Sequence, residues 1–325
     1  MSRAEVIGRY PEMVSAHYRK LIAESPAAAH LGRAVFASEL ELVGGDLDPC
    51  AEKSYEVFPG VQHKYQDTAL MTITSRCASY CRYCFRKRLW LRGAEHVFDA
   101  VAAIEYVSEH QEIVDVVLSG GDPLMVTRTL LHGLIRKLSR VPHVRTIRIG
   151  TRAPIYNPRL ITSRLLDTLR LARHRVGVYM PVHYSHPAEL SPSLDSIRRL
   201  QRAGVAVLAQ IPVLQGVNDS PGILSELLQG LTAAGIAPYY LFQCRPTAGN
   251  AHFSLTLGEL WSVFSRETSR LSGIGRRARL VVSHATGKME LVGADGDDVL
   301  LRRHRQPRGC SEQGLMRAPK SAKWP

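Results

Sequence analysis

The chain has 325 residues, of which 45% are hydrophobic and 22% are charged, and its formal net charge is +13. This composition predicts a soluble globular protein and excludes a membrane-spanning one, since no apolar run approaches the about 18 residues that cross a bilayer. The first residues also lack the basic and then apolar pattern of a signal peptide, so we expect a cytoplasmic protein without a membrane partner.

The positive charge raises nucleic acid as a partner, because basic patches bind phosphate backbones. Most arginines are nevertheless dispersed over stretches that read as helices, for example Arg170 and Arg198. Basic residues concentrate only near the end of the chain, at Arg302, Arg303, Arg305, Arg308, Arg317, Lys320 and Lys323. We therefore predict a disordered basic tail over residues 306–325, and nucleic-acid binding is not expected to be the main function.

Residues 1–60 are predicted to form an N-terminal helical extension and a connector. Residues 14–24 are amphipathic and residues 34–42 indicate a second short helix, while residues 46–60 carry the prolines and glycine of a connector. This extension would precede the main domain.

Short runs rich in β-branched residues recur about every thirty residues after the connector, and each is followed by a helix-like stretch. The predicted strands are residues 69–74, 114–119, 144–151, 176–183, 205–211 and 238–243. Six βα units predict an α/β fold, a partial (βα)6 TIM-like barrel of parallel strands over residues 61–270. An open doubly wound sheet would show the same periodicity. Residues 271–305 would add a small C-terminal β segment.

Several helix starts are marked by capping residues. Ser191 and Ser220 each offer an N-cap hydroxyl and precede a proline, and Thr256 with Glu259 has the form of a capping box. Because crossovers between parallel strands are right-handed, the residues that follow each strand should meet at one end of the barrel.

Three cysteines, Cys77, Cys81 and Cys84, follow the first strand with the spacing C-x3-C-x2-C. Thiolates are soft ligands for zinc or iron–sulfur clusters, and a set of three leaves one metal position open for a small molecule. Half of a zinc site completed by a histidine, or reduced core thiols, are the alternatives. The close spacing among basic residues argues against core thiols.

With an aromatic residue before the last cysteine, this motif resembles the signature of radical S-adenosylmethionine (SAM) enzymes, in which SAM chelates the open iron of a [4Fe-4S] cluster. Further motifs follow in order: Arg148-Ile-Gly-Thr-Arg152, His183-x-x-His186-Pro, Gly216-Val-Asn-Asp219 and Tyr239-Tyr-x-Phe-Gln-Cys244. Together they look like the lysine 2,3-aminomutase branch, over roughly residues 55–295.

The resemblance implies roles for residues at the strand ends. The segment Gly120-Gly121-Asp122 would hold the amino end of SAM, and His183 and Gln210 would line the SAM pocket. Arg86 would meet the carboxylate of an amino-acid substrate.

The same resemblance implies pyridoxal phosphate (PLP), bound covalently by a lysine near the end of the barrel. Lys288 occupies the matching place, at a tight turn between the strand-like residues 279–282 and 289–292. A desolvated lysine has a lowered pKa and reacts as a free amine, so Lys288 is the predicted catalytic and PLP-binding residue. Thr68 stands where the lysine enzymes carry an arginine near the PLP phosphate, and Lys64 keeps a basic group in that region.

Two departures from the lysine enzymes concern the substrate and zinc. Arg245 stands where they hold the distant ammonium of lysine with an aspartate, which inverts the charge of the pocket and predicts an anionic or neutral side chain. Ser220 replaces a zinc-binding cysteine and the tail keeps only Cys310, so no zinc is predicted.

The sequence therefore predicts a radical SAM aminomutase, an isomerase that shifts an amino group between adjacent carbons of a small-molecule amino acid. Its cofactors would be a [4Fe-4S] cluster, SAM and PLP. Its electron donor would be a flavodoxin or ferredoxin, and the prediction is compatible with a homo-oligomer. Two alternatives stay open: a PLP-independent radical SAM enzyme, and a basic cluster-containing nucleic-acid-binding protein.

Overall fold

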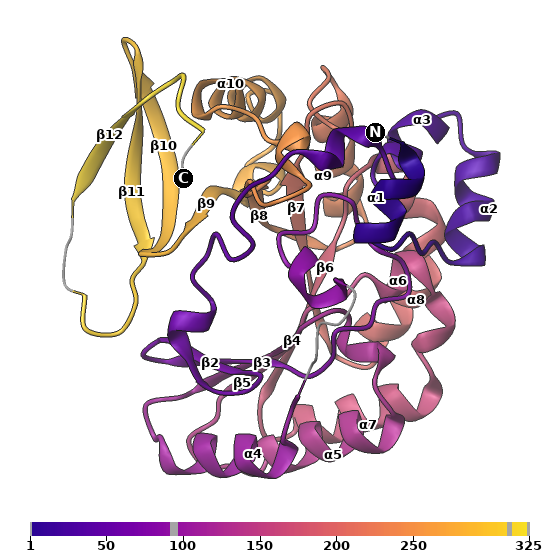
Figure 1. Cartoon of the computed structure of the whole chain (residues 1–325). Coiled ribbons are helices and arrows are strands. Elements are labelled where there is room, and N and C mark those ends of the chain that lie inside the picture. The colour runs from indigo at the N-terminus through magenta and orange to yellow at the C-terminus, as the bar shows by residue number, and fades with distance from the viewer. Residues whose placement is uncertain (1, 92–96, 311–313, 324–325) are drawn as a thin grey trace.

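The computed structural model contains one twelve-stranded sheet, and strands that are neighbours in this sheet are also neighbours in the chain (Figure 1). The structure describes residues 2–91, 97–310 and 314–323. Because the strand order runs from β1 to β12 without a reversal, the described sheet has no switch point of the kind that defines a doubly wound fold. The sheet is curved but not closed, with β1 and β12 at its edges, so the partial barrel is confirmed.

Seven consecutive strands run parallel, and the first six confirm the predicted strands. They are β3 (Thr68–Thr72), β4 (Asp115–Ser119), β5 (Thr146–Ile149), β6 (Gly177–His183), β7 (Ala206–Val213), β8 (Ala237–Gln243) and β9 (Arg279–His284). The sequence analysis recognised residues 279–282 as strand-like but assigned them to the C-terminal segment, whereas the structure makes them part of β9, a seventh parallel strand.

Helices cover the outer face of the parallel strands (Figure 1). They are α4 (Ala100–Glu109), α5 (Arg128–Leu138), α7 (Ser163–Arg173), α8 (Leu190–Arg202), α9 (Ile223–Ala233) and α10 (Leu257–Thr268). The short α6 (Ala153–Tyr156) follows β5 and packs against α8 and α2. Leu131, Leu134 and Leu138 of α5 are buried at helical spacing, which explains why this segment folds as an amphipathic helix against the sheet.

One of the three predicted helix caps is confirmed. Thr256 and Glu259 form the capping box of α10. Ser191 lies inside α8, which begins at Leu190 directly after a 3-10 turn capped by His186, so the predicted cap is wrong. Ser220 is also not a cap, because α9 begins after Gly222, whose φ of 89° turns the chain into the helix.

The two faces of the parallel strands differ in their environment. Residues facing the helices, such as Val116, Leu118 and Ile147, are buried in the main hydrophobic core. The alternate residues are only half-buried: Asp115, Val117, Ser119, Thr146, Arg148, Tyr179, His183, Leu208 and Gln210. We call this second face the lumen face. Its side chains include several polar ones, and they are less completely buried than those that face the helices.

The N-terminal extension packs beside the barrel (Figure 1). It contains α1 (Arg3–Arg9), α2 (Ala16–Glu24) and α3 (Ala28–Arg33), and it leads to the antiparallel strands β1 (Glu56–Phe58) and β2 (Val61–Tyr65). The helix predicted at residues 14–24 is confirmed as α2. The helix predicted at residues 34–42 is wrong, because α3 ends at Arg33 and a 3-10 turn occupies only Glu39–Leu42.

The C-terminal segment continues the sheet as an antiparallel meander that extends away from the barrel (Figure 1). Its strands are β10 (Gly287–Asp295), β11 (Asp298–Arg305) and β12 (Leu315–Pro319). The prediction of a disordered basic tail is therefore wrong for residues 314–323. After β12 the chain also bonds α10, where the Gly258 amide donates to the Lys320 carbonyl at 2.9 Å. The sequence analysis did not recognise Leu315–Pro319 as a strand, because this short segment lies among basic residues.

The described helices include none with the length and apolar character needed to cross a membrane.

Candidate functional site

The cysteine loop begins where β3 ends, and the glycines after β4 hold it there. The amides of Gly121 and Asp122 donate to the carbonyls of Thr74 and Arg76, both at 2.7 Å. A Cβ on Gly120, whose φ is +119°, would lie 2.2 Å from the Thr74 oxygen. The paired glycines are therefore required for close packing against the loop, and SAM binding by Gly120 and Gly121 stays a prediction.

Asp122, the third residue of that predicted SAM segment, is buried and bonded to the protein. Its carboxylate accepts from the Thr151 hydroxyl at 2.8 Å, from the Arg152 amide at 2.9 Å and from the Leu124 amide at 3.0 Å. These contacts tie the loop after β4 to the loop after β5. The structure thus gives Asp122 a role in supporting the site rather than a free carboxylate for a ligand.

The three cysteines of the loop are each half-buried and lie close enough to affect one another's pKa. Burial raises the pKa of Cys84 to about 11, and the neighbouring Cys81 adds to the effect. Burial raises the pKa of Cys77 as well, with Asp122, Cys84 and Cys81 as its next causes. In the described residues, no three Cys, His, Asp or Glu side chains converge tightly enough for one metal ion. An iron–sulfur cluster does not need that convergence, because its thiolates bind different irons.

Cys81 has two polar partners that the sequence analysis did not assign to the site. The Tyr156 hydroxyl lies 3.1 Å from its sulfur, and Arg152 donates to the same sulfur at 3.6 Å. The Arg152 guanidinium also lies over the Tyr156 ring, 4.3 Å from its centre. Both side chains are buried, so their polarity acts on the sulfur with little screening by water. Both partners lie within hydrogen-bonding reach of the Cys81 sulfur.

A buried carboxylate holds these two partners of Cys81 in place. Glu189 accepts from Arg152 and from the Tyr18 hydroxyl, the latter at 2.6 Å. It also accepts from the Ser185 hydroxyl at 2.9 Å, and the Tyr18 ring packs edge-on against Tyr156. Because Tyr18 belongs to α2, the N-terminal extension is part of the support for the cysteine loop.

The basic residues that follow the cysteines are paired with two other buried carboxylates. Glu41 binds both Arg82 and Lys87, at 2.6 and 2.7 Å. Glu52 binds Arg86 at 2.6 Å, and Arg88 is its second partner. These ion pairs fix residues 82–88 to the N-terminal extension and the connector.

The structure brings the two predicted SAM-pocket side chains together. His183 of β6 and Gln210 of β7 are paired in register, and the His183 Nε2 lies 2.8 Å from the Gln210 side-chain oxygen. Burial, followed by the field of Arg152, lowers the pKa of His183 to about 4, so the ring is neutral at pH 7. Both side chains lie on the lumen face near Arg152, as expected for one pocket wall.

Arg86, the predicted ligand of the substrate carboxylate, is engaged by the protein. Its Nε and Nη2 bind Glu52, and its Nη1 donates to the Ser119 hydroxyl at 2.9 Å. In this conformation a substrate carboxylate would reach the guanidinium only by displacing Glu52. Glu52 was not identified from the sequence, because it lies in the connector far from any motif.

The connector also contacts the other predicted cations. Lys64 donates to the carbonyls of Cys50 and His284 at 3.2 and 2.9 Å, and Arg245 donates to the carbonyl of Pro49 at 2.9 Å. Lys64 and Arg245 both act on the pKa of Cys50, which burial raises to about 11. The two predicted cations therefore lie close together, between the connector and the turn before β10.

Lys288, the predicted catalytic residue, is surrounded by aromatic rings. Its Nζ lies 5.1, 5.8 and 5.9 Å from the ring centres of Tyr240, Phe242 and Tyr65. No ion pair links it to a carboxylate in the described part of the chain. The ring faces attract a cation, but the loss of water without a compensating carboxylate disfavours the ammonium form of this lysine.

The pKa of Lys288 follows from these surroundings. Burial is the largest cause, the fields of Arg148 and Arg305 come next, and together they lower it to about 7. The neutral amine is therefore a much larger fraction of Lys288 at pH 7 than of a solvated lysine. This is the protonation state that a covalent amine catalyst needs.

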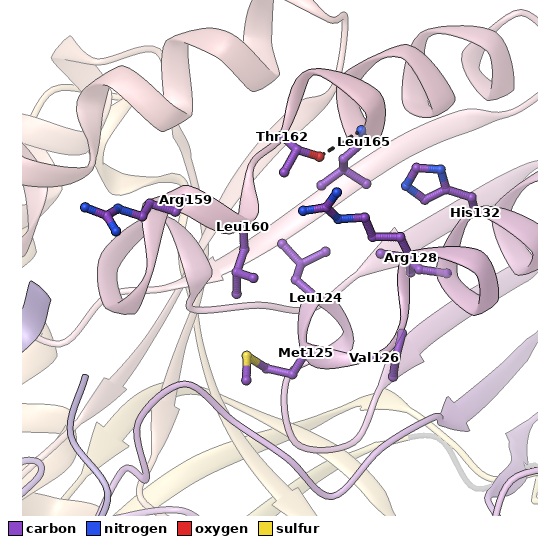
Figure 2. Close-up of a pocket in the computed structure, with 10 residues that line it drawn as sticks. Leu124, Met125, Val126, Arg128, His132, Arg159, Leu160, Thr162 and Leu165 are labelled. Carbon is purple, nitrogen blue, oxygen red and sulfur yellow. Dashed lines mark hydrogen bonds between the residues drawn. The ribbon is translucent and has the colours of Figure 1, made fainter. Parts of the chain in front are cut away.

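A pocket of about 160 Å³ lies elsewhere, between α5 and the start of α7 (Figure 2). Leu124, Leu160 and Leu165 form its apolar floor, and Arg128 and Arg159 stand at its sides. It contains none of the predicted site residues, so it is separate from the lumen face.

Comparison with known proteins agrees with this geometry. Residues 71–225 match the family described as the radical SAM superfamily. An L-lysine 2,3-aminomutase homologue from Aquifex aeolicus (strain VF5) is 35% identical over 308 residues, which are 93% of this chain and 82% of that protein. The L-lysine 2,3-aminomutase of Escherichia coli (strain K12) is 34% identical, over 74% of this chain and 71% of that protein.

Among solved structures, Streptococcus suis SuiB bound to S-adenosylmethionine is similar with a TM-score of 0.50. The match covers 71% of this chain and 52% of that chain at 12% identity. At that identity the similarity supports the fold alone.

Proposed function

The chain belongs to the lysine 2,3-aminomutase-like family of the radical SAM superfamily, and on that basis we propose that it moves an amino group between the α and β carbons of a small-molecule amino acid. It is an enzyme. The observation that carries the proposal is the lumen face, which has three half-buried cysteines near one end and a lysine with a pKa of about 7 near the other.

The family implies a [4Fe-4S] cluster and SAM, and the residues present fit both. Cys77, Cys81 and Cys84 would hold the cluster, with Tyr156 and Arg152 stabilising the Cys81 sulfur. When bound and reduced by one electron, from a flavodoxin or ferredoxin, cluster and SAM supply the radical that abstracts an unactivated hydrogen. The neutral His183 and its partner Gln210 would form one wall of the SAM pocket.

Lys288 and its surroundings fit PLP, which when bound supplies an electron sink next to the migrating amino group. The neutral fraction of the Lys288 amine is the reactive group, because only an unprotonated amine attacks an aldehyde. The rings of Tyr65, Tyr240 and Phe242 exclude water from the amine and offer flat apolar surfaces to an aromatic cofactor. Lys64 adds positive charge nearby.

The substrate is proposed to carry an anionic or neutral side chain. Arg245 and Lys64 bring two cations to the region between the connector and the turn before β10, beside the carboxylates of Asp46, Asp48 and Glu52. A lysine side chain placed directly against the two cations would be repelled. An acidic amino acid such as glutamate is the simplest substrate. Arg86 would take its α-carboxylate in exchange for Glu52.

The test is an anaerobic assay of the reconstituted protein with SAM, PLP, dithionite and a panel of amino acids, analysed by mass spectrometry for β-amino acids. We expect a β-amino product from glutamate or a neutral analogue, and none from lysine. Reductive cleavage of SAM without any β-amino product, or without dependence on PLP, would favour a PLP-independent enzyme. No cleavage of SAM would reject both enzyme hypotheses.

A further inference from the structure

Lys288 and Arg305 stand directly opposite each other in the antiparallel pair β10–β11. Side chains of directly opposite residues project from the same face of the sheet, with Cβ atoms about 5 Å apart. Two cations at such positions repel each other. The close approach of the strands is built in, because a Cβ on the preceding Gly287 would lie 2.1 Å from the Arg305 carbonyl oxygen.

The ring of Tyr65 joins these two cations. The Arg305 guanidinium carbon lies 4.2 Å from the ring centre, and the Lys288 Nζ lies 5.9 Å from the same centre. From this position Arg305 also donates to the Thr68 hydroxyl at 3.0 Å, across a separation of 237 residues. Arg305 therefore extends from β11 to the start of β3, beside the lumen.

Positive charge exceeds negative charge around this pair. Arg148 is bound by Asp115, and Arg305 is bound by Asp67, which is 57% exposed to solvent. Lys288 has no carboxylate of its own among the described residues, and Lys64 adds a further cation to its field. An apolar wall with excess cations attracts an anion, and a dianion would neutralise the excess best.

We propose that Arg305 binds the phosphate of the PLP that Lys288 holds. This inference rests on the proposed function. The lysine enzymes have an arginine near the PLP phosphate at the position of Thr68. In this chain the Arg305 guanidinium, from a distant strand, lies beside the Thr68 side chain and would replace that arginine. An arginine suits this task, because its planar fork makes paired hydrogen bonds to phosphate oxygens.

The experiment compares PLP with pyridoxal, which has the same aldehyde but no phosphate. The Lys288 amine expels the aldehyde oxygen as water in both cases, and borohydride then fixes the adduct for mass mapping. Binding of each aldehyde is measured with the full-length protein, with Arg305→Gln and Arg305→Lys, and with Arg302→Gln as the matched control. Arg302 is on the same strand, exposed and bound to Glu290 away from this site.

The ratio of the two affinities isolates the phosphate, because a change in the reactivity of Lys288 affects both aldehydes equally. We expect the unaltered protein and Arg302→Gln to prefer PLP by a factor of about 10 to 100, and Arg305→Gln to lose at least tenfold of that preference. Arg305→Lys should keep part of it, since it retains the charge without the fork.

Equal preference for PLP in the unaltered protein and in both Arg305 variants would overturn the inference while leaving the proposed function intact. An unaltered protein that forms no adduct at Lys288 with either aldehyde would overturn both. Circular dichroism and thermal unfolding of each variant show whether a weakened affinity reflects the site or a loss of folded protein, and Arg305→Lys provides the folded test if Arg305→Gln is lost.

Discussion

The two ends of the lumen face differ in how their charged side chains are paired. Around the cysteine loop, Arg82 and Lys87 share Glu41, Arg86 and Arg88 share Glu52, and Arg152 is held by Glu189. Around Lys288 the described carboxylates are fewer than the cations, and the lysine is enclosed by aromatic rings. One end is a scaffold whose charged side chains named here are paired with carboxylates, and the other is left with unmatched charge that a ligand would satisfy.

The difference predicts that substitutions near the cysteine loop mainly affect the stability of the protein and that substitution of Lys288 mainly affects its activity. Buried ion pairs that are complete cost much when broken, because the surviving partner stays desolvated. An unmatched buried cation lowers the stability of the free protein, and removing it relieves that cost. The change in the free energy of unfolding caused by a substitution should therefore differ between the two ends in sign as well as in size.

The largest effect is expected from Cys81→Ala. Loss of one of three thiolates removes a ligand of the cluster, so the variant should contain no stable [4Fe-4S] cluster after anaerobic reconstitution. Iron analysis, the visible absorption spectrum and reductive SAM cleavage measure this. Cys310→Ala, at an exposed cysteine outside the loop, should match the unaltered protein. Normal SAM cleavage by Cys81→Ala would falsify the cluster assignment.

At the opposite end, Lys288→Met should abolish the covalent PLP adduct and reduce aminomutase turnover by a factor of about 1000 or more. Its free energy of unfolding should stay unchanged or rise by about 1 kcal/mol, because methionine fills a similar space without a desolvated charge. Borohydride trapping and denaturant unfolding measure the two effects. Lys137→Met, at an exposed lysine of α5, is the control. A large loss of stability in Lys288→Met would contradict the contrast between the ends.

Glu189→Gln tests the scaffold end. Arg152 would be left buried with a neutral partner, so we expect the free energy of unfolding to fall by about 3 to 5 kcal/mol. Asp167→Asn breaks the exposed pair with Arg170 and should cost about 0 to 1 kcal/mol. Denaturant unfolding of the two variants compares them directly. Similar small losses in both would mean that the buried network is not a scaffold.

The smallest effect is a pH dependence of adduct formation. Because the pKa of Lys288 is lowered to about 7, the neutral fraction of the amine should increase about tenfold between pH 6 and pH 8 and then level off. The unfolded protein binds this proton up to about pH 10, so the lysine's contribution to stability should become more favourable as pH rises from 7 to 10. Adduct formation that keeps rising tenfold per pH unit to pH 10 would indicate an ordinary solvated lysine.

The parts of the site that the sequence predicted are those encoded locally. The cysteine spacing, the βα periodicity and the turn before Lys288 each lie within a short segment, and the comparisons confirm the family that these motifs indicate. Each side chain that follows a parallel strand was placed at one end of the barrel by the handedness of crossovers alone. The shared pocket of His183 and Gln210 was implied by the family resemblance, and the structure pairs these two residues in register on neighbouring strands.

The partners of those residues could not be predicted, because they come from distant segments. Glu52 reaches Arg86 from the connector, Glu189 reaches Arg152 from the loop before α8, and Arg305 reaches Thr68 across 237 residues. Glu52, Glu189 and Arg305 all lie outside the motifs that the sequence analysis identified. The strand β12 was missed for a related reason: its basic residues resemble a solvated tail until the pairing with β11 is known.

The order of strands in the sheet also matters for how the chain is made. Since the sheet order follows the chain order from β1 to β12, no strand has to be inserted between two that were synthesised earlier. Each strand that leaves the ribosome finds its earlier neighbour already made, and the cysteine loop is complete about 200 residues before Lys288, or on the order of 10 to 40 s at usual rates of synthesis. The cysteine loop is thus synthesised, and can begin to fold, before the segment that carries Lys288.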